Sequence, residues 1–99
     1  VKNMVITVLE AQVTPGQVEA LQTAYQQAAQ HLDPGIVETF LLRGSRDPDR
    51  WQIVTLWESR TALDTMRQSG ETPRGVLIFR SAGAEPQLSV FEVAQHAAA

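Results

Sequence analysis

Three threonines share one side of the strands that the sequence predicts. Thr7, Thr39 and Thr55 occupy odd positions in three apolar segments, and because successive strand side chains point to opposite faces, all three would face the same layer. A hydroxyl group both donates and accepts hydrogen bonds. Three of them in one interlayer space indicate a partly polar pocket, unless each is satisfied by backbone or placed by β-propensity alone.

A tryptophan closes the most apolar of these segments, residues 51–57. Trp57 is either a core residue beneath a helix or a pocket wall that stacks on an aromatic substrate, since large aromatics serve both purposes. Glu58 and Ser59 follow it. We interpret this pair as a strand end and a helix cap rather than an acid–base pair.

Three further ionisable side chains are candidates for stabilising an anion or acting as a base. Arg43 and Arg80 could counter a substrate anion, although solvated charges are the simpler interpretation. His31 lies near a predicted helix C-terminus, where a positive charge is favourable, and would act as a base only if that helix end borders the pocket. Because His31 and His96 are far apart and the chain has no cysteine, we expect no metal site.

The elements that position these residues follow from periodicity and turn signals. Strands are predicted over residues 4–13, 36–43, 51–57 and 87–95. Thr14 and Gln17 form a capping-box pattern that opens a first helix. Its apolar stripe is Val18, Leu21, Tyr25, Ala28 and Leu32. Ser59 opens a second helix that ends near Gly70, and residues 45–49 have turn chemistry typical of a hairpin.

This order, β-α-β-β-α-β, predicts an α+β ferredoxin-like fold, a four-stranded antiparallel sheet with the helices on one face. At 99 residues the whole chain, 1–99, is expected to be one domain, with 96–99 a frayed tail. Residues 71–86 fit either a helix or an extended segment, and we favour a helix over 72–79.

The other sheet face is apolar as well. It would carry Met4, Ile6, Val8, Ile36, Phe40, Leu42, Val54 and Leu56. Exposing a large apolar side chain forfeits roughly 1.5 to 3 kcal/mol, and a whole domain is stable by only ~5 to 15 kcal/mol. We therefore expect a homodimer packed sheet against sheet.

Composition narrows the classes of partner. The net charge is −3 and no basic cluster is present, so no nucleic-acid partner is expected. No apolar run approaches the ~20 residues that a membrane span needs. A cytoplasmic location with no membrane association is the expectation.

These patterns resemble the antibiotic-biosynthesis-monooxygenase family of dimeric α/β-barrel proteins. The residues that carry the resemblance are Pro34-Gly35, Leu41-Leu42-Arg43, Val54-Thr55-Leu56-Trp57-Glu58-Ser59, Ala62-Leu63 and Phe91-Glu92-Val93. Family members include oxygenases that use no metal or organic cofactor, quinol monooxygenases and haem-degrading enzymes. The resemblance implies a dimer whose subunits each hold a pocket between helices and sheet.

The haem-degrading branch uses an Asn, a Trp and a His ligand where this chain has Thr7, Met66 and Gly75. None of the three fits that route. Thr23 and Thr39 occupy positions where aromatic residues would sandwich a porphyrin, and quinol oxidases of the family often have a His where Met66 stands. No cofactor is therefore expected, with haem as the alternative.

The sequence thus predicts a small cofactor-independent monooxygenase that oxidises a phenolic or quinol-like aromatic with O2, with no fixed catalytic residue identified. The expected pocket residues are Thr7, Leu9, Tyr25, Thr39, Ile53, Thr55, Trp57, Leu63, Met66 and Phe79. Two alternatives remain open: a haem-binding or haem-degrading protein with altered ligation, and a non-catalytic ligand-binding dimer of the same fold.

Overall fold

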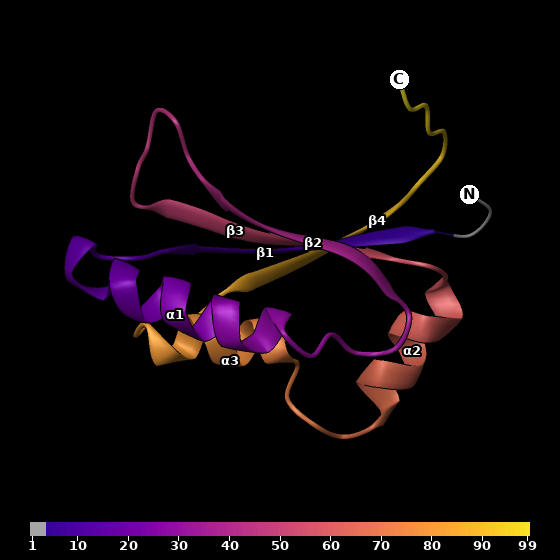
Figure 1. The fold of residues 1–99 in the computed structure, drawn as a ribbon, viewed down its shortest axis with the longest axis horizontal. Coiled ribbons are helices and arrows are strands. Elements are labelled where there is room, and N and C mark those ends of the chain that lie inside the picture. Colours follow the sequence, from indigo (N-terminus) through magenta and orange to yellow (C-terminus); the bar gives the residue numbers. More distant parts are fainter. Residues whose placement is uncertain (1–3) are drawn as a thin grey trace.

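The computed structural model describes residues 4–99 and has one sheet with helices on one side of it (Figure 1). Residues 1–3 of the expected domain lie outside the described residues. The strands are β1 (Val5–Gln12), β2 (Ile36–Arg43), β3 (Arg50–Trp57) and β4 (Gln87–Glu92). The helices are α1 (Val18–Ala29), α2 (Arg60–Gln68) and α3 (Arg74–Ser81), and a 3-10 turn (Pro15–Gln17) precedes α1.

The sheet order β2-β3-β1-β4, with antiparallel neighbours throughout, confirms the ferredoxin-like α+β fold. A bend at residues 44–49 joins β2 to β3 as the predicted hairpin. Residues 74–81 are helical, as favoured from the sequence. The second helical region therefore consists of two short helices, α2 and α3, and both lie on the same side of the sheet as α1 (Figure 1).

Alternation along the strands decides what is buried. In β1 the odd positions Val5, Thr7, Leu9 and Ala11 are buried and the even positions are only partly covered, and β3 repeats this pattern. The main core joins this helix-facing side of the sheet to α1 and α3 through Leu21, Ile78 and Phe79 and others. A smaller cluster of Val5, Trp57 and Leu63 holds α2.

The start of α1 differs from the sequence prediction. Thr14 makes no side-chain capping bond, so the expected capping box is wrong. Instead the backbone N–H of Gln17 donates to the carbonyl of Thr14 at 2.9 Å and closes a 3-10 turn. Pro15 suits the first position of such a turn because it has no N–H to satisfy. The helix then ends at Ala29, which leaves Leu32 beyond it and 45% exposed.

Local contacts explain where α2 begins and where the last strand ends. The Ser59 hydroxyl accepts from the N–H of Ala62 at 3.0 Å, which confirms the predicted cap. The last strand is shorter than predicted and ends at Glu92, not at residue 95. Among the described residues it pairs with β1, and this ladder ends at the pair Val5–Glu92. One more backbone bond follows, from the N–H of Val93 to the carbonyl of Met4 at 3.0 Å.

A β-bulge at the start of β2 corrects one assignment of faces. The register shifts between Ile36 and Glu38, so Ile36 pairs with Trp57 and joins the helix-side cluster. We had expected Ile36 on the opposite face. An inserted residue breaks the two-residue alternation, and here it leaves Val37 48% exposed.

The face opposite the helices, called the open face below, remains uncovered in the single chain. Its residues are Ile6, Val8, Phe40, Leu42, Val54, Leu56 and Phe91, together with a polar end at Glu10, Arg50 and Gln52. Phe91 is 56% and Phe40 48% exposed. The β2–β3 hairpin and the chain after β4 both project from this side (Figure 1). No helix within residues 4–99 is long and apolar enough to cross a membrane.

Candidate functional site

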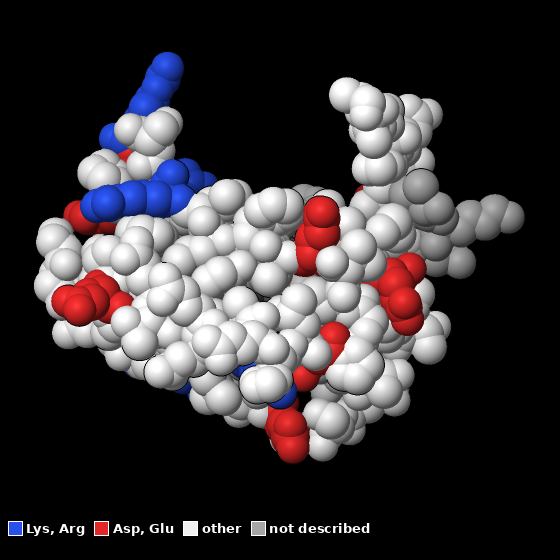
Figure 2. Space-filling model, viewed as in Figure 1, with Lys and Arg blue, Asp and Glu red and all other residues white. Residues whose placement is uncertain are grey.

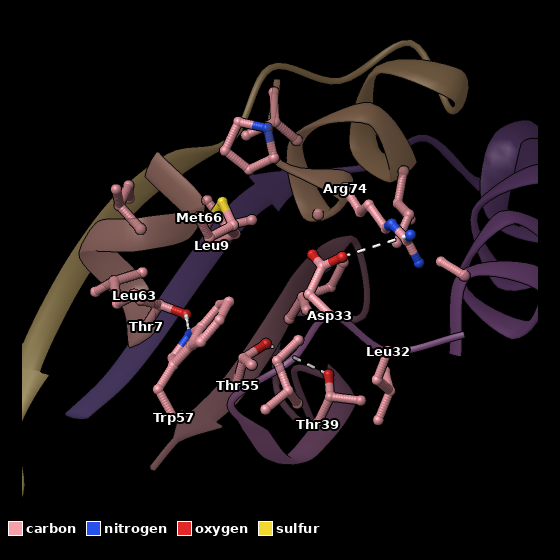
Figure 3. Close-up of a pocket in the computed structure, with 18 of the residues that line it drawn as sticks. Thr7, Leu9, Leu32, Asp33, Thr39, Thr55, Trp57, Leu63, Met66 and Arg74 are labelled. Atoms are coloured by element: carbon pink, nitrogen blue, oxygen red, sulfur yellow. Dashed lines mark hydrogen bonds and ion pairs between the residues drawn. The ribbon is translucent and has the colours of Figure 1, made fainter. Parts of the chain in front are cut away.

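A cavity of about 120 Å³ lies between the helix-facing side of the sheet and the helices (Figure 3). Nine of the ten predicted pocket residues line it: Thr7, Leu9, Tyr25, Thr39, Ile53, Thr55, Trp57, Leu63 and Met66. Phe79 does not line it. Its side chain is fully buried in the main core, whereas Val76 and Ile78 of the same helix line the cavity.

The strand register places the three threonines in one row across the sheet. Thr7 pairs with Thr55 between β1 and β3, and Thr55 pairs with Thr39 between β3 and β2. The Thr39 and Thr55 hydroxyls lie 3.4 Å apart, and the Tyr25 hydroxyl donates to Thr39 Oγ1 at 3.4 Å. Tyr25 therefore extends the row from the sheet to α1.

This hydroxyl row keeps one proton free. Tyr25 donates to Thr39, and either hydroxyl can donate in the Thr39–Thr55 bond, so the proton of Thr39 or of Thr55 has no partner within the row. Thr55 is 9% exposed and lines the cavity. The row can therefore offer a directed hydrogen-bond donor to an oxygen atom of a bound molecule.

The position of Trp57 fits both interpretations given from the sequence, a core residue beneath a helix and a wall of the pocket. It is 4% exposed and belongs to the cluster beneath α2, yet its ring also lines the cavity. Its indole Nε1 donates to Thr7 Oγ1 at 3.1 Å (Figure 3). This bond satisfies the indole N–H and fixes the plane of the ring, which is the arrangement that a stacking wall requires.

The three ionisable candidates lie elsewhere. Arg43 lies over the Trp51 ring at 5.1 Å and donates from Nε to the carbonyl of Pro48. Arg80 pairs with Glu85 at 2.8 Å. His31 is exposed in the turn after α1. None of the three lines the cavity.

The charged residues that do line the cavity were missed from the sequence. They are Asp33, Arg67 and Arg74. The Arg74 guanidinium lies 3.4 Å from the Asp33 carboxylate and also donates to the backbone carbonyl of His31. Asp33 precedes Pro34 in a turn and Arg74 follows Pro73, so neither residue belongs to a periodic pattern in the sequence. The packing of α3 against the end of α1 brings the two side chains together.

Two surface ion pairs show shifted pKa values, and neither pair lines the cavity. The hydrogen bond from Arg50 lowers the pKa of Glu10, with a further contribution from Gln52. The hydrogen bond from Arg80 lowers the pKa of Glu85. These shifts belong to the surface of the fold and not to the chemistry of the cavity.

A second, more open cavity of about 490 Å³ adjoins the first beside α2. Nine of the fourteen residues that line it are polar, and five of these carry a hydroxyl group, such as Ser59, Thr61 and Thr65. The two cavities share four residues: Asp33, Met66, Pro73 and Arg74. The Asp33–Arg74 pair thus lies at the junction between an apolar inner cavity and a polar outer one.

The inner cavity is a poor fit for haem. A porphyrin is several times larger than about 120 Å³, and none of the residues that line this space is a histidine. Met66 lines it, but a methionine at helical spacing is an ordinary packing residue. Thr23, one of the positions considered for a porphyrin sandwich, is exposed on α1 and lies outside the lining. Among residues 4–99 no cluster of three His, Asp or Glu side chains could hold a metal ion.

The fold and cavity define the class as a ferredoxin-like α+β domain with a site between sheet and helices. Residues 4–75 match the model of the family described as antibiotic biosynthesis monooxygenase, and the chain belongs to this family. Comparison with the curated proteins finds no significant match.

Solved structures agree on the fold at low sequence identity. A variant of SnoaB, a cofactor-independent oxygenase from Streptomyces nogalater, is 16% identical with a TM-score of 0.72, covering 95% of this chain and 96% of its own. A conserved protein from Methanosarcina mazei is 14% identical with a TM-score of 0.71, covering 90% and 91%. A conserved protein of unknown function from Bacteroides thetaiotaomicron is 19% identical with a TM-score of 0.69, covering 93% and 99%.

Proposed function

We propose that this protein is a cofactor-independent monooxygenase that oxidises a small phenolic or quinol-like aromatic with O2. One observation carries the proposal: an apolar cavity with a fixed tryptophan wall also contains a row of hydroxyl groups with a proton to donate. Membership of the family and the shared fold of an oxygenase of known type support it.

The chemistry asks little of the protein because the substrate supplies the electrons. A phenol or quinol loses its proton to solvent, the anion passes one electron to O2, and the radical pair recombines and takes up a proton to give a ring hydroperoxide. Loss of water from this hydroperoxide breaks the O–O bond and leaves one oxygen atom on the ring as a quinone. The site must exclude water, orient the ring and stabilise developing charge on oxygen. Trp57 and the aliphatic lining meet the first two needs, and the Thr55 hydroxyl is placed to meet the third.

The size of the inner cavity limits the substrate. An engineered protein cavity of about 150 Å³ holds one benzene ring, and this cavity measures about 120 Å³. The reacting part of the substrate is therefore a single ring or the edge of a larger ring system. Any further part of the molecule extends into the outer cavity, whose hydroxyl-rich lining suits polar substituents.

The proposal includes a homodimer formed through the open face. Covering Phe40, Leu42 and Phe91 would remove their exposed apolar surface from water, at roughly 25 cal/mol per Å². The hairpin and the C-terminal segment border this face, and Figure 2 shows arginine side chains gathered at the hairpin with mostly uncharged surface between the two projections. A second copy offers an equally apolar face of the same twist, which is the usual basis of two-fold assembly.

Oxygen uptake with a panel of quinols and single-ring phenols tests the function. Thr55→Val keeps the shape of the side chain and removes the donor, so we expect turnover to fall at least ~10-fold, the size of one hydrogen bond to a charged group. Thr23→Val removes an exposed hydroxyl outside the cavity and should leave turnover unchanged. No uptake with any member of the panel would contradict the proposal in favour of a non-catalytic ligand-binding dimer.

The haem alternative has its own test. Titration with haemin at micromolar concentration should produce no Soret shift if the small inner cavity is the binding site. A saturable shift would contradict the cofactor-independent proposal and identify altered ligation.

A further inference from the structure

Arg74 occupies a position that the proposed function does not yet use. It is the first residue of α3 and lines both the inner and the outer cavity. Its side chain is 49% exposed, so the guanidinium is reachable from the outer cavity. Figure 3 shows it facing Asp33 across the mouth of the inner cavity, with Met66 and Leu9 on the neighbouring wall.

The contacts of Arg74 leave it capacity to bind a ligand. A guanidinium has five N–H donors and prefers planar, two-point contact with an anion. Here its Asp33 contact is a single approach at 3.4 Å, whereas the surface pairs Arg50–Glu10 and Arg80–Glu85 close to 2.7 and 2.8 Å. The other contact, to the His31 carbonyl, is to a neutral group. An anionic oxygen in the cavity can therefore exchange with Asp33.

The rest of the cavity then fixes the class of ligand. Beyond Arg74 the walls combine the hydroxyl row with apolar side chains, which include Leu9, Ile53, Trp57 and Met66. A purely aliphatic acid would leave the tryptophan ring without a stacking partner, and a neutral aromatic would leave the guanidinium with Asp33. A ring that carries an ionisable oxygen satisfies both groups.

We propose that Arg74 is the specificity-determining residue of this cavity, and that it selects small aromatics bound as the oxygen anion, with Asp33 as the resident competitor for the same guanidinium. The inference rests on the proposed function, because the phenolate is the form that passes an electron to O2. A cation beside a phenol oxygen stabilises its ionised form and so lowers the pKa of the bound phenol.

The test uses two probes of nearly the same shape, 4-nitrophenol and its methyl ether 4-nitroanisole. The phenolate of the first absorbs visible light, so its ionisation on binding is read directly, and titration calorimetry gives both affinities. The wild-type protein should bind the phenol at least ~10-fold more tightly than the ether, the value of about 1.4 kcal/mol of charge-assisted bonding. Its visible absorbance should rise on binding below the phenol's own pKa.

Four substitutions make the test specific. Arg74→Gln should abolish the absorbance rise and equalise the two affinities, and Arg74→Lys should restore part of the preference. Arg80→Gln removes an arginine of the same helix that pairs with Glu85 outside the cavity, and should change nothing. Asp33→Asn should tighten phenolate binding, because it removes the competing carboxylate. Thermal melting of each variant establishes that it is folded.

Four results would overturn the inference: equal binding of phenol and ether by the wild type, no binding of either probe, weaker phenolate binding in Asp33→Asn, or loss of the preference in Arg67→Gln in place of Arg74→Gln. The proposed function fails separately. Phenolate binding that depends on Arg74 without oxygen uptake would contradict the oxygenase and leave the ligand class standing. Turnover that persists without any preference for the anion would contradict the role of Arg74 and leave the oxygenase standing.

Discussion

Both faces of the sheet carry large apolar side chains, but these side chains differ in how much of their surface is exposed. On the helix side Trp57 and Ile53 are 4% exposed, packed beneath helices that also enclose the cavity. On the open face Phe91 and Phe40 remain about half exposed in the single chain. The comparison teaches that stability and assembly are divided between the faces: one folds the chain and shapes the site, and the other is available to a second subunit.

The largest expected effect comes from the covered face. Leu21 is fully buried in the main core, so Leu21→Ala should lower the free energy of unfolding by about 2–5 kcal/mol, through lost burial and the cavity that remains. Urea denaturation measures this change. The loss should be the same at low and high protein concentration, and a loss that disappears on dilution would mean that Leu21 stabilises the assembly and not the subunit.

A substitution on the open face should instead weaken the assembly and leave the fold of the subunit intact. Phe91→Asp places a charge within the proposed dimer contact, on the edge strand β4. We expect the Kd of the dimer to rise at least ~100-fold, about 2.7 kcal/mol. Analytical ultracentrifugation follows the shift to a single-chain species. Leu77→Asp is the matched control, since Leu77 is 51% exposed on α3 and lies away from this face. A wild-type protein that is well folded and monomeric when dilute would break the comparison itself.

The smallest expected effect is on the pH dependence of stability, through two carboxylates that lie on opposite sides of the sheet. Arg50 lowers the pKa of Glu10 on the open face, and Arg80 lowers the pKa of Glu85 on the helix side, from the ordinary value of 4.5. A lowered pKa means that each carboxylate stabilises the fold above that ordinary value and that the contribution is lost as the pH falls through the folded-state pKa. Glu10→Gln and Glu85→Gln should therefore each flatten the acid side of the stability profile slightly.

Protein concentration distinguishes these two substitutions. If the open face is covered in a dimer, the effect of Glu10→Gln should grow with protein concentration and that of Glu85→Gln should not. Thermal melting between pH 3 and pH 7, roughly the range around carboxylate titration, gives both profiles. Equal, concentration-independent effects would argue that the polar end of the open face lies outside the contact.

Much of the site was predictable because strand alternation is a local rule. The parity of Thr7, Thr39 and Thr55 sufficed to place all three on one side, and the same parity led to Trp57 and Ile53. The rule failed at Ile36, where a β-bulge moves the side chain to the helix-facing side of the sheet. The alternation of apolar residues in the sequence does not indicate this bulge. Phe79 was predicted to line the pocket, but the sequence could not indicate which residues of α3 face the cavity and which face the core.

The charged mouth of the cavity could not be predicted in this way. Asp33 lies in the turn after α1, and Arg74 lies in residues 71–86, which the sequence leaves between a helix and an extended segment. Their meeting depends on how α3 lies against α1, which is a matter of packing among residues distant in the chain. Arg43, Arg80 and His31 were the more visible candidates, and the structure gives all three other surroundings.

The sequence alone determined the alternating strands, the cap at Ser59 and two apolar sheet faces, because each of these depends on residues within a few positions of one another. Only the tertiary structure decided which hydroxyls lie within hydrogen-bond distance of one another and which arginines line the cavity. Those contacts depend on strand register and helix placement, where a shift of one residue or a few ångströms changes every partner.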